Sequence, residues 1–363
     1  MKTYRQLYHK ITSWDNLLMA AKNATRGRQF NAPVAGFNFR LERELLKLQQ
    51  ELEDMSYQPG PYTTFRIHDP KARMISAAPF RDRVVHHALC NVIEPVFEKT
   101  FIFDSFANRK GKGAQRAIER YQYYARKYQY VLKCDVRKFF PSLDHSILKA
   151  AFRWKIQCPE TLWLSDLILD NSNLQESVTD VLRPLGLPDH DRRGLPIGNL
   201  TSQFWANVYM NRFDHFVKET LQVPGYIRYV DDFVLFSKDK VQLAHLLEEI
   251  KAYLATLRLV LHPTKTHIHH TKSGVPFLGY RVWPDYRIAK KERVRRFRRH
   301  ISLVLMQKPT NYQLLEQALN SWLGHIRFGQ AGRLEYQVFW GLRDKGVNVL
   351  VHPRGSWRVL MGN

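Results

Sequence analysis

Two adjacent carboxylates, Asp231 and Asp232, stand between two short and mostly apolar runs of the chain, residues 226–230 and 233–236. Both runs have the length and composition of buried β-strands, which predicts that the pair lies at the tip of a tight hairpin. Two unpaired carboxylates at that point would repel each other and lose solvation. A divalent cation would offset both costs, and oxygen ligands suit magnesium. The alternative is a solvated Asp-Asp turn.

The chain also carries a large excess of positive charge. Its 363 residues include 56 Lys and Arg against 33 Asp and Glu, a formal net charge of +23. This imbalance predicts a polyanionic partner, nucleic acid first and an anionic membrane second. No apolar stretch approaches the ~20 residues of a membrane-spanning helix, and residues 1–14 lack the apolar region of a signal peptide. We therefore expect no membrane partner.

Cysteine spacing and apolar content narrow the class of protein. Cys90, Cys134 and Cys158 are far apart and form no Cys-x-x-Cys pair, which argues against a zinc or disulfide framework. Reduced thiols of this kind predict a cytoplasmic protein. A hydrophobic content of 44% supports real cores, and the length allows two or three domains.

Helical and strand patterns alternate irregularly, which predicts an α+β fold. Pro95 is expected to limit the helix at residues 84–94, and the helix at residues 199–221 is expected to be amphipathic. Residues 155–193 look like an insertion. A single strand is expected near residues 275–282. Helices are predicted at residues 41–55, 84–94, 114–128, 199–221 and 240–259.

A third carboxylate, Asp135, ends another apolar run, residues 130–135, which is predicted to be a buried strand. It can meet the hairpin tip if the two elements are neighbours in one antiparallel sheet. Three carboxylates there could hold two magnesium ions, which activate a hydroxyl, orient a triphosphate and stabilise the leaving pyrophosphate. Asp144 is a rival ligand, but either Asp144 or Ser142 is expected to cap the next helix.

The segments around these carboxylates resemble the motifs of reverse transcriptases. Upstream, RMISAAPFRDRVVHHAL and SFANRKGKGAQRAI are similar to the fingers motifs of prokaryotic reverse transcriptases, so the resemblance runs from about residue 60 to about residue 285. Motifs A to E are matched in order by YVLKCDVRKFFPSLDH, GLPIGNLTSQFWANVYM, YVDDFVLFS, LHPTKTHI and VPFLGYRV.

The resemblance implies an RNA-directed DNA polymerase with a right-hand fold. Its parts would be fingers, a palm with an antiparallel sheet and packed helices, and a helical thumb. On this chain the N-terminal region and fingers would cover residues 1–129. The palm, with the 155–193 insertion and the motif B helix, would cover 130–285, and the basic thumb and C-terminal tail 286–363.

Carried over by position, Asp135, Asp231 and Asp232 would bind two Mg²⁺ ions, for which Mn²⁺ can substitute, with the backbone of Val136 beside the triphosphate. Lys265, at the motif D position, would protonate departing pyrophosphate. Lys71 and Arg73 match the basic fingers residues that grip the triphosphate, a role that suits the forked guanidinium of arginine. A solvated surface is the alternative for these basic residues.

Two further matches concern the sugar and the primer. Phe140 falls where reverse transcriptases keep a ring against the sugar of the incoming nucleotide, leaving no room for a 2′-hydroxyl. Its alternative role is that of a core residue. The primer-grip strand is matched by Phe277, Leu278, Gly279 and Tyr280, although packing alone would also explain these four.

Motif B departs from the usual pattern of a Gln before the glycine and Ser-Pro after it. The chain reads Pro196-Ile197-Gly198 and then Ser202-Gln203. This form is similar to the reverse transcriptases of diversity-generating retroelements, which copy a template-repeat RNA with errors at adenines and rewrite a target gene by mutagenic retrohoming. Ile197 offers only apolar contact where Gln would hydrogen-bond, and Gly198 permits close backbone approach. The alternative is neutral drift.

The resemblance implies template RNA, nascent cDNA, dNTPs and a basic, oligomeric accessory variability protein as partners, in a prokaryotic or phage-encoded system. The competing interpretations are a retron-like or phage-defence reverse transcriptase and an inactive RNA-binding scaffold. Retention of three mutually repelling carboxylates argues against the scaffold. A basic helix in residues 290–300 would follow the template–primer backbone with Lys290, Lys291, Arg295, Arg296, Arg298 and Arg299.

Overall fold

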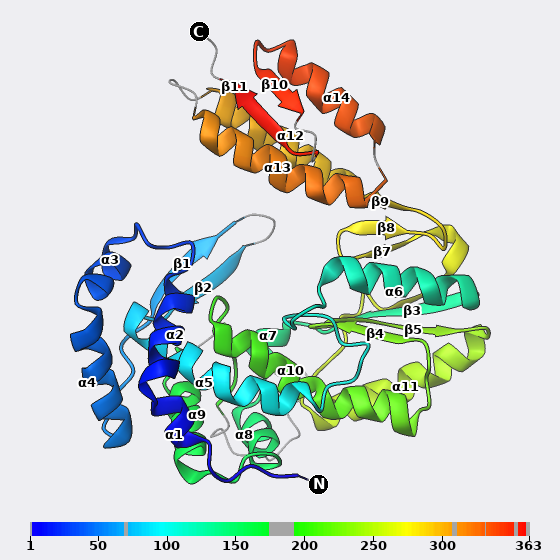
Figure 1. The fold of residues 1–363 in the computed structure, drawn as a ribbon. Helices are drawn as coiled ribbons and strands as arrows, with labels where there is room; N and C mark the ends of the chain where they lie inside the picture. The colour runs from blue at the N-terminus through cyan, green and yellow to red at the C-terminus, as the bar shows by residue number, and fades with distance from the viewer. Residues whose placement is uncertain are drawn as a thin grey trace. The chain divides into compact units, whose positions relative to one another are not determined.

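The computed structural model describes residues 2–68, 72–173, 192–306, 311–330, 332–351 and 355–360. Its contacts divide the chain into two units (Figure 1). The first comprises Met1–Gly111, Lys133–Val234 and Ala244–His267, and the second Lys112–Leu132, Leu235–Leu243 and Ile268–Asn363. Helices and small antiparallel sheets alternate in both, so the predicted α+β class is confirmed.

The N-terminal part of the first unit is helical and packs around the long helix α5 (Phe80–Glu98). Pro95 lies inside this helix, so the prediction that it limits the helix was wrong. Pro95 lies in the last turn, where it removes one backbone hydrogen bond. The free energy lost with that bond is smaller than the stabilisation from burying Val96 and Phe97. The other elements here are α1 (Tyr8–Thr12), α2 (Trp14–Thr25), α3 (Ala32–Phe39), α4 (Leu41–Glu53) and the antiparallel pair β1 (Thr63–Ile67) and β2 (Arg73–Ala77).

A four-stranded sheet carries the predicted carboxylates. Its strand order is β4-β5-β3-β6, with β3 at Tyr130–Asp135, β4 at Tyr226–Tyr229, β5 at Asp232–Ser237 and β6 at His267–His270. The two-residue turn between β4 and β5 holds Asp231, which confirms the predicted hairpin. Because β3 and β5 are neighbours, the end of β3 and this turn lie at one edge of the sheet.

The helices that follow β3 confirm one expectation, helix capping by Asp144, and correct another, the amphipathic character of the motif B helix. Asp144, rather than Ser142, caps α8 (His145–Arg153) by accepting bonds from the backbone N–H groups of Ser146 and Ile147. The expected insertion contains an ordered helix, α9 (Pro159–Asp170), while residues 174–191 lie outside the described chain. Helix α10 (Leu200–His215) is not amphipathic but buried on nearly all sides, because it packs between α5 and α8, and it continues as a π-helix, Phe216–Thr220.

The second unit contains α6 (Ala114–Lys127) and a three-stranded antiparallel sheet, β7-β8-β9. The strand expected near 275–282 is a hairpin, β7 (Val275–Phe277) and β8 (Tyr280–Val282), followed by β9 (Arg287–Ala289). A separate core surrounds Trp322, which stacks on Phe297 at 3.9 Å between ring centres. This core is built from α12 (Lys291–Met306), α13 (Tyr312–Phe328), α14 (Gly332–Arg343) and a hairpin of β10 (Asn348–Val351) and β11 (Trp357–Leu360). The sequence pattern did not predict the hairpin.

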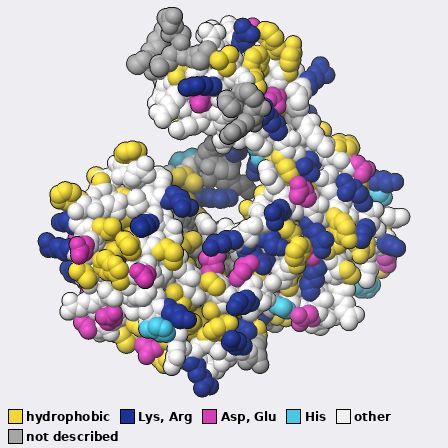
Figure 2. Space-filling model, viewed as in Figure 1, with side chains coloured by type: hydrophobic (Ala, Val, Ile, Leu, Met, Phe, Trp, Pro, Cys, Tyr) yellow, Lys and Arg dark blue, Asp and Glu magenta, His cyan; other side chains and the backbone are white. Residues whose placement is uncertain are grey.

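The remaining elements are α7 (Phe139–Ser142), α11 (Lys240–Thr256) and a 3-10 turn at Thr271–Ser273. In the described ranges, no helix has both the length and the apolar character needed to cross a membrane. Lys and Arg side chains are spread over the face seen in Figure 2, as the net charge requires.

Candidate active site

Backbone hydrogen bonds hold the end of β3 on both sides. The N–H of Val136 donates to the carbonyl of Asp231 at 3.2 Å, which joins β3 to the hairpin turn. On the other side, the N–H of His262 donates to the carbonyl of Asp135 at 2.7 Å, and that of Arg137 donates to Val260 at 2.8 Å. Asp135 and Asp231 are therefore fixed near each other by main-chain contacts, independently of their side chains.

The side chains of Asp135 and Asp231 share one electrostatic environment. Burial, and next the charge of Asp135, raise the pKa of Asp231 to about 6 from its ordinary value of 3.8. Lys265 and Arg73 act in the opposite direction. The ammonium of Lys265 donates to Asp135 Oδ1 at 2.5 Å. Three of the predicted site residues, from motifs A, C and D, thus lie together, and the charge of Arg73 in the fingers segment acts on one of them.

Asp232 has a different environment. Its carboxylate lies 3.7 Å from the ammonium of Lys133, which is on β3. Within the ranges that the structure describes, no three Asp, Glu, His or Cys side chains are grouped closely enough to hold a metal ion. The structure brings together two of the three predicted ligands, and metal binding itself stays a prediction.

The donor chemistry of the Asp135–Asp231 pair nevertheless fits a divalent cation. Burial and the neighbouring charge of Asp135 make ionisation of Asp231 more costly, as its raised pKa records. A divalent cation would remove that cost, and carboxylate oxygens are its preferred ligands.

Phe139 and Phe140 form a pair with different environments. Phe139 is buried in the core, whereas Phe140 is only partly buried. Their rings meet edge to face at 5.5 Å. The carbonyl of Phe140 accepts a bond from the N–H of Leu195 at 2.9 Å, which places it beside the motif B segment.

Motif B is docked on β2. The carbonyl of Ile197 accepts a bond from the N–H of Ser76 at 3.0 Å, and Gly198 has a φ of 117°. A Cβ at Gly198 would stand 3.0 Å from Ile75 Cγ2, so both the conformation and the space favour glycine. Ile197 is partly buried and Gln203 is exposed. Arg73 begins β2, while Lys71 lies outside the described residues.

The predicted primer-grip residues form the β7–β8 hairpin of the second unit. Phe277 is buried and stacks on Tyr121 at 5.3 Å. Leu278 and Gly279 make the turn with positive φ, and a Cβ at Gly279 would overlap the guanidinium of Arg293. The Tyr280 hydroxyl donates to the carbonyl of His325 at 2.8 Å.

The predicted template–primer residues extend from this hairpin into α12. Lys290 precedes the helix, and its N–H donates to the carbonyl of Gly279 at 3.1 Å. The others lie on α12 and are exposed: Lys291, Arg295, Arg296, Arg298 and Arg299.

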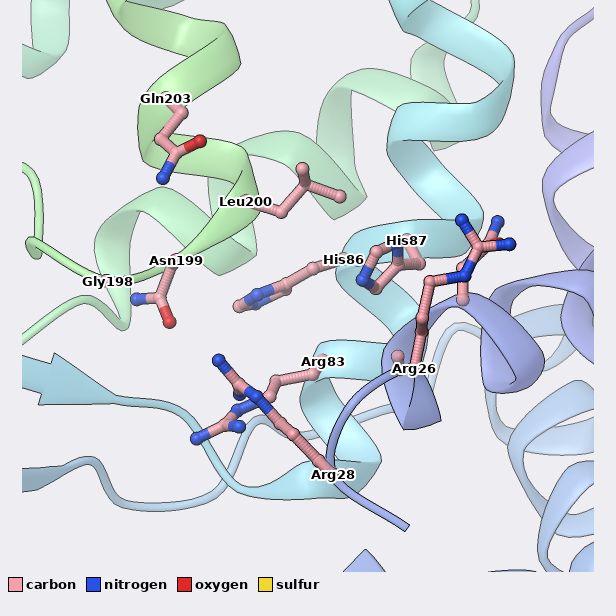
Figure 3. Close-up of a pocket in the computed structure, with 11 residues that line it drawn as sticks. Arg26, Arg28, Arg83, His86, His87, Gly198, Asn199, Leu200 and Gln203 are labelled. Carbon is pink, nitrogen blue, oxygen red and sulfur yellow. The ribbon is translucent and has the colours of Figure 1, made fainter. Parts of the chain in front are cut away.

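Sequence reasoning missed a basic cavity of about 220 Å³ in the first unit. Arg26 and Arg28 line it from the segment after α2, Arg83 lines it from α5, and residues 198–200 and 203 line it from motif B. Figure 3 shows the Arg28 and Arg83 side chains lying together. The pKa of Arg83 is lowered, first by burial and then by the charge of Arg28. No Asp or Glu is among the described residues that line the cavity.

Two buried polar side chains of this cavity have atoms without a hydrogen-bond partner among the described residues. They are Nδ1 of His86, 2% exposed, and Nδ2 of Asn199, 3% exposed. Asn199 also precedes the N-terminus of α10, where unpaired backbone N–H groups favour an anion. The cavity therefore has the properties of a phosphate site. The Arg-Gly-Arg and Arg-Asp-Arg stretches were visible in the sequence, but their meeting depends on how α2 packs along α5.

Burial lowers the pKa of His86 to about 3. The neutral imidazole thus contributes stability that is complete above pH 6.5 and is lost as the pH falls from there toward 3. At pH 5 the loss is about 2 kcal/mol. We expect His86→Gln to lose less of its unfolding free energy than the wild type between pH 7.5 and pH 5, measured by urea denaturation. His9→Gln, at an exposed histidine of α1, is the control; equal losses in all three proteins would contradict the prediction.

Comparison with known proteins identifies the family of the chain. The family model for reverse transcriptase (RNA-dependent DNA polymerase) matches residues 67–282, more than half of the chain. The chain therefore belongs to the reverse transcriptase family and is an RNA-directed DNA polymerase.

The relatives differ in how much of their length is shared. Protein YkfC of Escherichia coli K12 is 26% identical in an alignment that covers 85% of this chain and 89% of YkfC. The group II intron-encoded protein LtrA of Lactococcus lactis is 20% identical, over 70% of this chain and 51% of LtrA. A putative COX1/OXI3 intron 2 protein of Saccharomyces cerevisiae is 20% identical, over 82% of this chain and 42% of its own length. The chain thus spans about half of LtrA.

Proposed function

We propose that the chain adds deoxynucleotides at the end of β3, where Asp135 and Asp231 lie together. The observation that carries the proposal is the backbone bond from Val136 to Asp231, because it joins the two main-chain segments that carry the carboxylates, whatever the charge of those side chains. Primer extension on an RNA template with the four dNTPs and Mg²⁺ tests it. A wild-type protein that makes no cDNA under these conditions would contradict it.

Within this proposal, Asp135, Asp231 and the backbone of Val136 would hold Mg²⁺, with Asp232, the first residue of β5, as a further carboxylate. The bound ions would supply charge for the triphosphate and for the leaving group. Lys265, whose ammonium is within hydrogen-bonding distance of Asp135, carries a proton at the place where pyrophosphate departs. Arg73 holds the triphosphate, and its effect on Asp231 supports this position.

The domain roles follow from these placements. Residues 1–129 would act as N-terminal region and fingers, 130–285 as the palm, and 286–363 as the thumb and C-terminal tail. The exposed basic residues of α12 support contact with a template–primer backbone, since each neutralised phosphate releases counterions.

We further propose that the basic cavity holds a phosphate of the template RNA. Its three arginines face no carboxylate of the lining, and motif B forms its opposite wall. We expect the double variant Arg28→Gln/Arg83→Gln to bind template RNA about 10-fold more weakly at low salt, with the slope of log K against log salt reduced by about 1 to 2. Fluorescence anisotropy at several salt concentrations measures both. Arg40→Gln, an exposed arginine on the same unit, is the matched control; equal weakening in the control would remove the assignment.

The finer function that we propose is low-fidelity copying of a template-repeat RNA in a diversity-generating retroelement, assisted by a basic oligomeric accessory protein. Ile197 supports it, because a partly buried apolar side chain at this point offers no hydrogen bond to the nascent base pair. The names of the relatives favour a second candidate, an enzyme of the group II intron type. Faithful cDNA would favour the group II intron type of enzyme. Errors at template adenines would favour the diversity-generating retroelement.

Replacement of Ile197 tests this choice within the protein itself. We expect Ile197→Gln to lower misincorporation opposite template adenine, by about 10-fold at most, because a hydrogen-bonding side chain adds a cost of about 1 kcal/mol to mispairs. The measurement is the error spectrum of sequenced cDNA. Ile197→Leu, which keeps an apolar contact, is the control and should retain the wild-type spectrum. An unchanged spectrum in Ile197→Gln would remove motif B as the cause of low fidelity.

A further inference from the structure

The turn that carries Asp231, directly before Asp232, contains an unusual backbone conformation. Val230 has a φ of 59°, in the left-handed region that β-branched residues rarely adopt. Hairpin turns with positive φ at the first central residue normally use glycine there. A valine in this conformation must be held by its surroundings. The question is which contact holds it.

Arg228, two residues earlier on β4, makes that contact. Its side chain is fully buried, and Nη1 donates to the carbonyl of Val230 at 3.0 Å. The rest of the guanidinium is fixed from α10. Nε and Nη2 donate to the two carboxylate oxygens of Asp214 at 2.7 and 2.6 Å, and Nη1 also donates to Asn207 at 3.2 Å. A bond from Nη2 to Ser105 Oγ at 3.3 Å completes the set.

This network is more than stability requires. A buried ion pair is costly to desolvate, and apolar residues of similar volume often serve a core equally well. Arginine supplies what they do not, which is a rigid donor fork that binds a carboxylate with two bonds and leaves a third N–H for another acceptor. Here the third acceptor is the carbonyl beside Asp231. The same helix, α10, begins at motif B, so the turn and motif B are fixed to one element.

We propose that Arg228 is a positioning residue that fixes the backbone of the Val230–Asp231 turn from α10, and so sets where the Asp231 carboxylate lies. This inference rests on the proposed function only for its effect on nucleotide addition. In this role Arg228 touches neither substrate nor metal. It acts through the peptide between Val230 and Asp231.

Arg228→Lys separates this role from the ion pair. Lysine keeps a positive charge beside Asp214 but has one nitrogen, which cannot bind both carboxylate oxygens and the carbonyl of Val230 together. We expect amide hydrogen exchange of the peptide covering residues 226–236 to become at least about 10-fold faster in metal-free buffer. At saturating dNTP, the single-turnover rate should fall by about 10-fold or more, with KM for dNTP within about 2-fold of wild type.

Two comparison variants make the result specific. Tyr226→Phe removes another bond to Asp214, of 2.7 Å, and leaves the contact with Val230 intact, so exchange and rate should match wild type. Adding Val230→Gly to Arg228→Lys should restore part of the rate, because glycine adopts positive φ without strain. If Arg228→Lys does not fold, Arg228→Met/Asp214→Leu replaces it, since that pair leaves no buried single charge.

Wild-type exchange and rate in Arg228→Lys would overturn the proposal, and so would an equal loss in Tyr226→Phe. Failure of Val230→Gly to restore any rate would also overturn it, because the loss would then be one of general stability. If the wild-type protein makes no cDNA, the proposed function fails. The exchange comparison then still decides the role of Arg228.

Discussion

Asp231→Asn is expected to lower the rate of nucleotide addition by about 10³-fold, the largest effect of any single replacement considered. A bound divalent ion stabilises transition-state charge by several kcal/mol, and about 4 kcal/mol corresponds to this factor. Asn keeps the volume of the side chain and the backbone bond from Val136, so the change removes charge with little else. Single-turnover primer extension at saturating Mg²⁺ and dNTP measures the effect. Asp54→Asn, an exposed aspartate at the end of α4, is the control and should be unaffected.

The same variant should be more stable than the wild type at neutral pH, which separates lost activity from unfolding. The pKa of Asp231 is raised to about 6, so its contribution to stability is complete below pH 3.8 and is lost as the pH rises through 6. A change from 3.8 to about 6 corresponds to at most about 3 kcal/mol. Asn escapes this loss. In EDTA, Tm of Asp231→Asn should exceed that of wild type at pH 7.5, with the difference shrinking toward pH 4. A lower Tm at pH 7.5 would contradict the shared environment of Asp135 and Asp231.

The parts of this site that could be predicted from the sequence depend on local patterns. Strand periodicity places Asp135 at the end of one strand and Asp231 in a hairpin turn, and the structure confirms both elements. Their meeting was conditional on strand order, which the sequence does not encode locally. The structure provides it because β5 and β3 are neighbours.

The features that could not be predicted depend on packing between distant segments. The contact of Asp232 with Lys133 requires knowing which side chains of β3 and β5 lie side by side. The basic cavity forms because α2 packs along α5, and α10 is buried on nearly all sides because α5 and α8 pack against it. Neither contact can be read from a local pattern. Pro95 was misjudged because a propensity rule ignored the burial of the residues that follow it. In each case tertiary contacts outweighed the local signal.

Phe140→Ala is expected to reduce discrimination against ribonucleotides by about 100-fold. Phe140 is partly buried, its carbonyl is bonded to Leu195 of motif B, and it follows Asp135 on the short helix α7. There its ring would meet the sugar of an incoming nucleotide. Alanine would leave room for a 2′-hydroxyl. The measurement is the ratio of kcat/KM for a dNTP to that for the matching rNTP on one RNA template. The gain should come from the rNTP value, with the dNTP value falling only modestly.

Phe139 provides the matched control, because it is the same residue type on the same helix but faces the core. Truncating a fully buried phenylalanine costs about 3–5 kcal/mol of stability, so Phe139→Leu is the better choice and should lower Tm. It should leave the dNTP-to-rNTP ratio unchanged, whereas Phe140→Ala should lower the ratio with a smaller change in Tm. If both variants lose discrimination in proportion to their loss of stability, Phe140 is a packing residue and the selection of deoxynucleotides arises elsewhere.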